Sequence, residues 1–405
     1  MTRRPTRLCI TPSALLLVAA TVASLTAASA SAGSGARPVS TSLPAITGRL
    51  LVGRALVGSL GTWSGRRPIR FARQWRRCDR SGGACRDIVG ANARRYLLTS
   101  ADVGAKLRLQ VTATNAQGSR RAASRATAAV VGPPPSPVIA AAGDIACDSG
   151  TATDTTCAQK ATSDLLVNRG LAGVLVLGDI QYENGELANF NAYYDPTWGR
   201  VKSITYPAPG NHEYNTPGAT GYYSYFSSRT SLPGYYSFDI GGWHLIALNS
   251  NCADVGGCDA GSTQTKWVEA DLAAHKNACT LAYWHHPRFN SGATHGSDST
   301  YQPWWQALYD AGADVVLAGH EHLYERFAPQ TPAGAADAAH GIRQFTVGTG
   351  GKTHHAFGPT APNSEVRNND TFGVLTLTLE PNGYVWRFVP EAGKTFSDSG
   401  SGSCH

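Results

Sequence analysis

Five short motifs of metal-binding side chains occur in the last two thirds of the sequence, and four of them follow an apolar run of strand length. In chain order they are Gly143-Asp144, Gly178-Asp179-Ile180-Gln181-Tyr182, Gly210-Asn211-His212-Glu213, Trp284-His285-His286-Pro287 and Gly319-His320-Glu321-His322. Open α/β sheets bind ligands just beyond the carboxyl ends of their strands. The motifs therefore predict an α/β domain in which these loops meet at one site.

The hydrophobic pattern supplies the expected elements. Strands are expected at residues 138–142, 174–177, 243–249, 280–284, 315–318 and 343–347, and they alternate with helical stretches at 262–275 and across 304–309. Residues 373–379 and 384–389 should form a hairpin around Pro381-Asn382-Gly383. In the expected helix 262–275, the side chains Trp267, Val268 and Leu272 should face inward.

The side chains of the motifs indicate two metal ions. Imidazole suits zinc, copper, iron and nickel, whereas carboxylate and amide oxygens suit harder ions, so this mixed set points to transition metals. Asp179 ends the strongest apolar run and is the natural carboxylate to bridge two ions. A hard trivalent ion would suit Asp144, Tyr182 and one histidine, and Asn211 with the other histidines would suit a divalent neighbour.

In this order the five motifs resemble those of the purple acid phosphatase branch of the calcineurin-like metallophosphoesterases, over roughly residues 138–390. The resemblance implies an α/β fold of four layers, in which two mixed sheets are flanked by helices. It also implies a dinuclear centre of Fe³⁺ with Fe²⁺, Zn²⁺ or Mn²⁺. The implied ligands are Asp144, Asp179, Tyr182 and His322 for the ferric ion, and Asp179, Asn211, His285 and His320 for the divalent ion.

The same resemblance implies roles for residues around the metals. His212 would be the general acid. In the family, a proline follows the histidine ligand by two positions, and this spacing selects His285 as the ligand. His286 is then expected to be structural or to support the ligands. His295 lies where family members place substrate-contacting histidines, some of them as a pair, but here only Thr294 and Gly296 flank it.

Other residues of the motifs receive weaker expectations. Glu213 either orients the ring of His212 or is solvated, and Glu325 with Arg326 is expected to hold the ligands from behind. Ala146 replaces a glycine that is usual in the family, without loss of a ligand. The glycine-rich residues 348–352 lack the spacing of a phosphate loop and predict a tight turn leading away from a strand. The histidines left with an ordinary surface or hydrogen-bonded role are His244, His275, His340, His354, His355 and His405.

The expected activity is hydrolysis of phosphomonoesters by attack of a metal-bound hydroxide, with His212 protonating the departing alkoxide. Hydrolysis of phosphodiesters or nucleotides by the same site is the first alternative, because the motifs specify the metal centre and not the pocket wall. A cell-surface protein that binds polyanions and carries a vestigial metal site is the second. The expected partner is a small phosphoester substrate, and the sequence carries no signal for an oligomeric state.

Residues 1–32 have the pattern of a signal peptide, with Arg3, Arg4 and Arg7 before an apolar stretch and small residues at 28–32 for cleavage. The mature chain is expected to be secreted, extracellular or associated with the cell wall, and to lack a transmembrane segment. Eight cysteines remain after Cys9, and an even number in an oxidising compartment predicts disulfides. Connectivity stays open, but spacing favours Cys78–Cys85, Cys147–Cys157 and Cys252–Cys258, which leaves Cys279–Cys404.

A proline-rich linker at residues 132–137 separates two predicted domains, 40–131 and 138–405. The first domain shows short alternating runs typical of an antiparallel sandwich. Its sequence segments around Trp63, around Trp75 and at residues 99–104 resemble bacterial immunoglobulin-like modules. The resemblance implies that Trp75 is the buried core tryptophan. Residues 40–132 hold 17 Lys and Arg against 3 Asp and Glu. This module is expected either to present a solvated arginine-rich face or to hold polyanions non-specifically.

Overall fold

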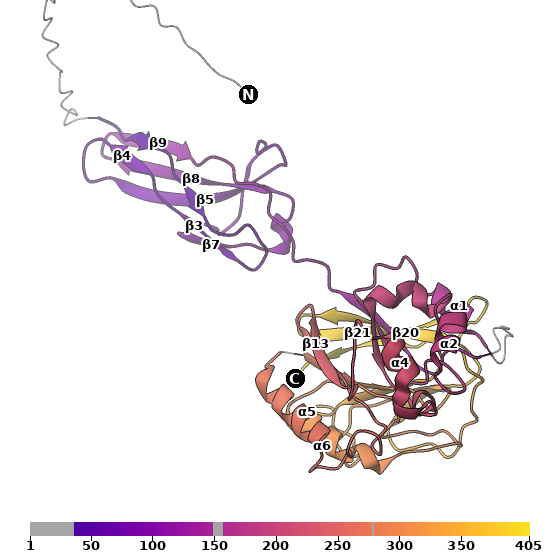
Figure 1. Ribbon diagram of the computed structural model, residues 1–405. Coiled ribbons are helices and arrows are strands. Elements are labelled where there is room, and N and C mark those ends of the chain that lie inside the picture. Colours follow the sequence, from indigo (N-terminus) through magenta and orange to yellow (C-terminus); the bar gives the residue numbers. More distant parts are fainter. Residues whose placement is uncertain (1–35, 149–156, 278) are drawn as a thin grey trace, which may run out of the picture. The chain divides into compact units, whose positions relative to one another are not determined.

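The computed structural model describes residues 36–148, 157–277 and 279–405, so the expected signal peptide lies outside the described residues. The chain divides into two compact units, Met1–Pro134 and Pro135–His405, each with its own hydrophobic core (Figure 1). The boundary falls inside the proline run at 132–137. Within the described ranges, none of the helices combines the length and the apolar character needed to cross a membrane.

The N-terminal unit is built of strands. β1 (Val39–Ser42) pairs with β4 (Thr62–Ser64), β3 (Ala55–Gly58) lies between β2 (Ile46–Thr47) and β7 (Arg95–Leu97), and the largest sheet has the order β6 (Arg86–Asp87), β5 (Arg70–Cys78), β8 (Lys106–Asn115), β9 (Gly118–Ala123). A 3-10 turn, η1, spans Ser100–Asp102. Alternate residues of β8 are buried around Trp75, whose side chain is fully buried. The strand-rich unit and its central tryptophan were expected, and the immunoglobulin-like assignment stays a prediction.

The C-terminal unit contains two mixed sheets. The first has the order β12 (Thr205–Ala208), β11 (Gly173–Leu177), β10 (Val138–Ala142), β20 (Gly373–Glu380), β21 (Gly383–Pro390), β22 (Ser399–Ser403). The second has the order β13 (Tyr236–Ile240), β14 (Trp243–Ala247), β15 (Cys279–Tyr283), β16 (Val315–Ala318), β18 (Arg343–Val347), β17 (Tyr324–Phe327), β19 (Ser364–Asn368). Strands β10, β11 and β12 run parallel in the first sheet, as do β14, β15, β16 and β18 in the second.

The two sheets face each other across one core, and helices cover the outer face of the second sheet. Along β15, Leu281 and Tyr283 join the core shared with the first sheet, whereas Ala282 between them packs with the helices. Those helices are α5 (Thr263–Ala274) and α6 (Gln302–Asp310), which follows the turn η5 (Ser299–Tyr301). The remaining helical segments of the unit are α1 (Gln159–Asp164), α2 (Leu187–Asn189), η2 (Phe190–Tyr194), η3 (Trp198–Ile204), α3 (Asn211–Tyr214), η4 (Pro217–Ala219) and α4 (Thr220–Tyr225). Helices α1, α2 and α4 lie on the side of this unit away from α5 and α6 (Figure 1). The predicted mixed-sheet fold is confirmed.

The expected strands, the two helices and the hairpin are all present, within two residues of the predicted bounds. Strand β12 was missed because Pro207 interrupts its pattern; β12 lies at the edge of its sheet, where a proline is tolerated. In α5, Val268 and Leu272 are buried as expected, and Trp267 is only partly buried. All four favoured disulfide pairings occur: Cys78–Cys85, Cys147–Cys157, Cys252–Cys258 and Cys279–Cys404.

Candidate metal centre

All five motifs lie just past the carboxyl end of a strand. Asp144 follows β10, Asp179 follows β11, Asn211 follows β12, His285 follows β15 and His320 follows β16. Three of them have a positive φ: 60° at Asp144, 45° at Asp179 and 69° at His320. Such left-handed conformations are uncommon for residues other than glycine and cluster at functional sites. Each strand therefore ends in a turn that brings a ligand-type side chain to the same edge.

Glycines in the motifs make room for these side chains. A Cβ at Gly210 would lie 2.2 Å from Asp179 Oδ1, and a Cβ at Gly178 would lie 2.5 Å from His285 Nδ1. The carboxylate of Asp144 is enclosed in the same way, since a Cβ at Gly348 would lie 2.7 Å from its Oδ2. Larger side chains at these positions would displace the carboxylates and the ring.

The glycine-rich residues 348–352 lead away from strand β18, as expected, and they then reach the metal centre. The backbone of Gly350 donates to the carbonyl of Gly143 at 2.9 Å, and that of Lys352 donates to the carbonyl of Asp144 at 2.9 Å. The turn after β18 thus folds back over the loop that carries Asp144.

One group of predicted ligands converges on the phenol of Tyr182. Its oxygen lies 3.0 Å from Asp144 Oδ1, 3.0 Å from His322 Nε2 and 3.2 Å from Asp179 Oδ2. Tyr182 and both carboxylates are buried, with at most 2% of each exposed. Burial, followed by the charges of Asp144 and Asp179, raises the pKa of Tyr182 well above its ordinary value. Only a cation among these groups would favour the phenolate.

The other group converges on His285. Its Nε2 lies 3.1 Å from Asn211 Oδ1, 3.2 Å from Asp179 Oδ2 and 3.1 Å from His320 Nδ1. The same oxygen of Asp179, Oδ2, therefore faces both the phenol of Tyr182 and the ring of His285. This is the position that a carboxylate bridging two ions would need.

The donor set fits metal ions better than a network of hydrogen bonds. His285 Nδ1 lies 2.8 Å from the carbonyl of Leu177 and donates to it, so a neutral ring presents only a lone pair at Nε2. That lone pair faces the oxygens of Asn211 and Asp179, which are acceptors too. At His322, Nδ1 likewise donates to Thr353 O at 2.7 Å, and Nε2 faces Asp144 Oδ1 at 3.4 Å and the hydroxyl of Tyr182 at 3.0 Å. A proton on His285 or a metal ion would turn this repulsion into attraction; burial would lower the pKa of His285, but the charge of Asp179 outweighs burial and raises it to about 9.

Comparison with known proteins agrees with this geometry. The family model of the calcineurin-like phosphoesterases matches residues 138–324, which include all five motifs. These residues form a calcineurin-like phosphoesterase domain. The domain thereby belongs to a class of metal-dependent phosphoester hydrolases.

Plant purple acid phosphatases are among the relatives of known sequence. The chain is 29% identical over 191 residues to purple acid phosphatase 15 of Arabidopsis thaliana, covering 38% of this chain and 35% of the relative. It is 30% identical over 230 residues to purple acid phosphatase 23 of the same plant, covering 46% and 47%. The matches thus span about half or less of the relatives' length.

Solved structures share the fold. A purple acid phosphatase from yellow lupin (Lupinus luteus) superposes with a TM-score of 0.56 at 16% identity, covering 90% of this chain and 74% of that one. GAP50, described as the anchor in the inner membrane complex of Plasmodium, superposes with a TM-score of 0.54 at 14% identity, covering 67% and 90%. The second likeness shows that this fold also occurs in a protein described by a structural role, so function has to be argued from the site.

His212 lies at the edge of the phosphoesterase site. Its Nδ1 donates to the backbone carbonyl of Glu183 at 2.6 Å, and its Nε2 is 3.9 Å from Asp179 Oδ2. The ring also rests against Tyr182, with 4.4 Å between ring centroids. Because Nδ1 is committed to Glu183, an acidic proton directed toward the substrate has to sit on Nε2.

Glu213 neither orients His212 nor is solvated, so both expectations for it are wrong. Its carboxylate is fully buried and accepts from the backbone nitrogens of Ile180 at 2.8 Å and Gly210 at 2.7 Å. Glu213 therefore ties the loop of Asp179 to the loop of Asn211. Burial, with the charge of Asp179, raises its pKa to about 7.

The expectation for Glu325 and Arg326 needs a similar adjustment, whereas His286 lies where a residue supporting the ligands would lie. His286 lies beside the centre: its Nδ1 is 2.7 Å from Ser250 Oγ, and its ring centroid is 4.3 Å from that of His320. Burial lowers the pKa of His286 to about 3. By contrast, Glu325 and Arg326 bond to none of the seven predicted ligands. Their partners are Ser291 and Ser364 for Glu325, and Asp398 and Glu365 for Arg326.

Sequence reasoning missed three residues at the site. Glu321, between the two histidines of the last motif, is fully buried and bonds to the loop of His295. Lys352 pairs with Glu183 and lies over the ring of Tyr182, 4.5 Å from its centroid. His355, expected to have an ordinary role, stacks on His322 with 3.9 Å between centroids. The position of Glu321 inside a motif could have drawn attention to it, but Lys352 and His355 reach the site only through loop packing.

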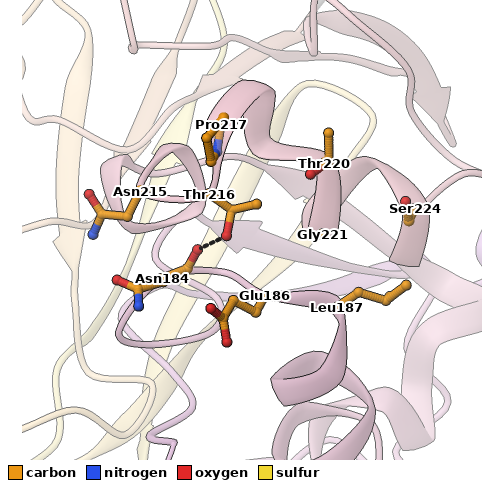
Figure 2. A pocket seen from close by; sticks show the side chains of 9 residues that line it. All are labelled: Asn184, Glu186, Leu187, Asn215, Thr216, Pro217, Thr220, Gly221 and Ser224. Atoms are coloured by element: carbon orange, nitrogen blue, oxygen red, sulfur yellow. Dashed lines mark hydrogen bonds between the residues drawn. The ribbon is translucent and has the colours of Figure 1, made fainter.

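A shallow hollow of about 490 Å³ begins beyond the Glu183 loop (Figure 2). Its lining mixes polar and apolar surface and has one charged side chain, Glu186; the lining residues are Asn184, Glu186, Leu187, Asn215, Thr216, Pro217, Thr220, Gly221 and Ser224. The two loops that form it are joined by Thr216, whose hydroxyl donates to the carbonyl of Asn184 at 2.6 Å. Asn215 donates to the Glu183 carbonyl, which also holds His212. The hollow thus adjoins the general-acid side of the centre.

Proposed function

We propose that the chain is a dinuclear metal-dependent phosphatase that hydrolyses phosphomonoesters. The observation that carries the proposal is the sharing of one oxygen, Asp179 Oδ2, between two groups of buried ligand atoms. Asp144, Tyr182 and His322 with Asp179 would hold Fe³⁺. Asn211, His285 and His320 with Asp179 would hold Fe²⁺, Zn²⁺ or Mn²⁺. Membership of the phosphoesterase family supports this reading.

Two bound ions would stabilise the attacking and leaving oxygens of an in-line displacement and make hydroxide available near neutral pH. The chain's own part is to hold the ligands rigidly and to move a proton. Glu213 fixes two ligand loops through backbone bonds, so the groups that receive the substrate are preorganised. His212 would donate the Nε2 proton to the departing alkoxide while the Glu183 carbonyl holds the ring.

The test is metal analysis of the purified protein together with assays on p-nitrophenyl phosphate and bis(p-nitrophenyl) phosphate. We expect iron, a second metal and faster hydrolysis of the monoester. Faster hydrolysis of the diester would favour the phosphodiesterase alternative instead. A protein without metal and without hydrolysis of either ester would overturn the proposal and favour a binding role.

The predicted iron ligand Tyr182 offers a spectroscopic check. A phenolate bound to Fe³⁺ gives a visible charge-transfer band, so the protein should be coloured and Tyr182→Phe should bleach it while leaving the other ligands in place. A colourless wild-type protein that contains iron would contradict this ligand assignment.

We further propose export and a polyanion-binding role for the N-terminal unit. Residues 1–32 match a signal peptide, and the disulfides favour an oxidising compartment. Residues 40–132 carry 17 Lys and Arg against 3 Asp and Glu, whereas 139–405 carry 14 against 25. Exposed arginines on β5 and β9, the two strands on either side of β8, include Arg70, Arg120 and Arg121 and suit anionic cell-wall polymers or nucleic acid.

This binding should be non-specific and should weaken steeply with salt, because it releases counterions. The units, separated at the proline linker, can be compared on heparin and on DNA at rising salt. We expect residues 40–132 to elute later than residues 138–405. Equal elution would show that the arginines form only a solvated surface.

A further inference from the structure

The hollow on the general-acid side of the centre lies between two walls (Figure 2). Residues 184–187 contribute one wall, and the other consists of residues 215–217 together with Thr220, Gly221 and Ser224 of α4. Its volume is about 490 Å³. Sites for small molecules commonly have volumes of about 300 to 1,000 Å³, so the hollow is large enough for part of a substrate.

The hollow begins one helical turn from the proposed acid. His212 lies on α3 and Asn215 caps that helix, so the two side chains share one face, with about 5–6 Å between their Cβ atoms. Both donate to the backbone carbonyl of Glu183, His212 Nδ1 at 2.6 Å and Asn215 Nδ2 at 3.0 Å. His295, by contrast, stacks on His320 with 3.8 Å between ring centroids and is not part of the lining. An alcohol that departs toward His212 therefore lies next to the hollow.

Glycine contacts fix the hollow against the helix of the acid. A Cβ at Gly185 would lie 2.6 Å from Glu213 Cα, and a Cβ at Gly221 would lie 2.0 Å from Gly185 O. The loop at residues 183–187 is thus packed between α3 and α4. Thr216 also joins the two walls, because its hydroxyl donates to the carbonyl of Asn184 at 2.6 Å. A subsite that is formed before binding loses less free energy when a ligand enters it.

The side chains of the lining suit hydroxyl groups. Asn184, Glu186, Thr220 and Ser224 are exposed, and in the part of the chain that the structure describes their side chains have no hydrogen-bond or ionic partner. Amides and hydroxyls both donate and accept, and a carboxylate accepts, so each can bond to an alcohol. Leu187, which is 40% exposed, adds an apolar surface for the carbon skeleton.

The charge of the hollow is negative. Glu186 is the one charged side chain among the lining residues, and Lys352 near the border is already paired with Glu183. A second phosphate or a carboxylate on the alcohol would face Glu186 without a basic residue of the lining to bind it. Such a juxtaposition of like charges disfavours the wrong ligand.

We propose that the hollow is the subsite for the alcohol part of the substrate, and that it selects neutral alcohols rich in hydroxyl groups, such as a hexose, over alcohols that carry a further anionic group. The inference rests on the proposed phosphatase function. In that reaction a water oxygen bonds to phosphorus, the bond from phosphorus to the alcohol oxygen breaks, and His212 gives that oxygen its proton. Glu186, Thr220 and Ser224 determine specificity and take no part in this chemical step.

The test compares glucose 6-phosphate with ethyl phosphate by the release of inorganic phosphate from the full-length, metal-containing protein. Both are monoesters of primary alcohols, so the ratio of their kcat/KM values reports on the remainder of the alcohol. Two variants alter the hollow: Ser224→Trp fills it, and Thr220→Ala removes one hydroxyl. Ser228→Trp, at an exposed position outside the lining, is the matched control.

We expect the wild-type protein to prefer glucose 6-phosphate by about tenfold, the effect of one or two net hydrogen bonds. Ser224→Trp should remove most of this preference, because the indole would occupy the place of the sugar. Thr220→Ala should reduce it by about three- to tenfold, the effect of one hydrogen bond. Ser228→Trp should keep the ratio of the wild type.

A third variant tests the charge of the hollow. The substrate 6-phosphogluconate carries a carboxylate that glucose 6-phosphate lacks. Glu186→Gln keeps the size of the side chain and removes its charge, so it should raise kcat/KM on 6-phosphogluconate relative to glucose 6-phosphate by about two- to fivefold, the range for exposed charges. An unchanged ratio would overturn the selection against anionic alcohols.

Equal kcat/KM values for glucose 6-phosphate and ethyl phosphate in the wild-type protein would overturn the subsite and leave the proposed phosphatase function intact. A full preference for the sugar ester in Ser224→Trp would also overturn it, since the alcohol would then bind elsewhere. A protein that contains its metals and hydrolyses no monoester would overturn the proposed function, and the subsite with it.

Discussion

The N-terminal unit and the metal centre of the C-terminal unit bury charged side chains in opposite ways. In the N-terminal unit the carboxylate of Asp102 is fully buried and fully paired: Arg77 donates to it at 2.6 and 2.8 Å, Tyr96 at 2.9 Å and Thr99 N at 2.8 Å. At the metal centre, the buried Asp179 and the partly buried Asn211 both present acceptor oxygens to Nε2 of His285. A buried carboxylate surrounded by donors stabilises a fold, whereas one facing other acceptors calls for a cation.

Removal of a predicted metal ligand should have the largest effect. We expect His320→Ala and Asn211→Ala to lose divalent metal and to lower kcat/KM on p-nitrophenyl phosphate by on the order of 10³-fold, equivalent to about 4 kcal/mol of transition-state stabilisation. His340→Ala, at an exposed position of the same unit, should keep both metal and rate. If His320→Ala retained its full metal content, His320 would not be a metal ligand, and the contrast between the metal centre and the paired Asp102 would be contradicted.

Loss of the proposed acid should separate proton transfer from metal binding. His212→Ala should retain both metals, because no predicted ligand depends on its ring. The rate should fall by about 10²- to 10⁴-fold for alkyl phosphates, which have poor leaving groups, and by less for p-nitrophenyl phosphate. Equal losses on the two substrate types would show that His212 is not the acid.

Loss of the paired carboxylate should affect stability alone. We expect Asp102→Asn to lower the free energy of unfolding of the N-terminal unit by about 1.5–3 kcal/mol, the range for hydrogen bonds to a charged group. Hydrogen exchange of the backbone of β8 would report this change. Hydrolysis of p-nitrophenyl phosphate should remain at the wild-type rate, and a large loss of rate would mean that the units are coupled.

The smallest effect should come from a buried histidine of the C-terminal unit that resembles Asp102 in being fully paired. His244 bonds to Asp239 at 2.9 Å and to Asp271 at 2.7 Å, and His275 stacks on its ring. Burial alone would lower the pKa of His244, but the bonds to Asp271 and Asp239 outweigh burial and raise it.

Because the folded-state pKa of His244 lies above the unfolded value of about 6.5, its stabilisation is complete below that pH and is lost as pH rises through the folded-state pKa. We expect urea unfolding to show a loss of up to about 1.5 kcal/mol between pH 6 and pH 9, the lower value for one charge-assisted hydrogen bond. His244→Gln should be less stable at pH 6 and should lack this slope. If His244→Gln showed the same dependence of stability on pH as the wild type, groups other than His244 would cause that dependence.

Much of the metal centre could be predicted because each ligand lies within a few residues of an apolar strand. An apolar run, a glycine and a polar side chain specify a turn at the carboxyl end of a buried strand, and the five such turns meet at one edge once the strands pair.

The strands, the order of the motifs and the types of ligand side chain follow from residues close together in the chain, so they can be predicted from local sequence. The groups that surround the ligands follow from the folded arrangement. Glu213 binds backbone nitrogens on another loop, Glu321 is enclosed opposite Gly292, and His355 reaches the site because two distant loops pair. Such contacts follow from the packing of segments remote in sequence, so no local pattern of residues encodes them.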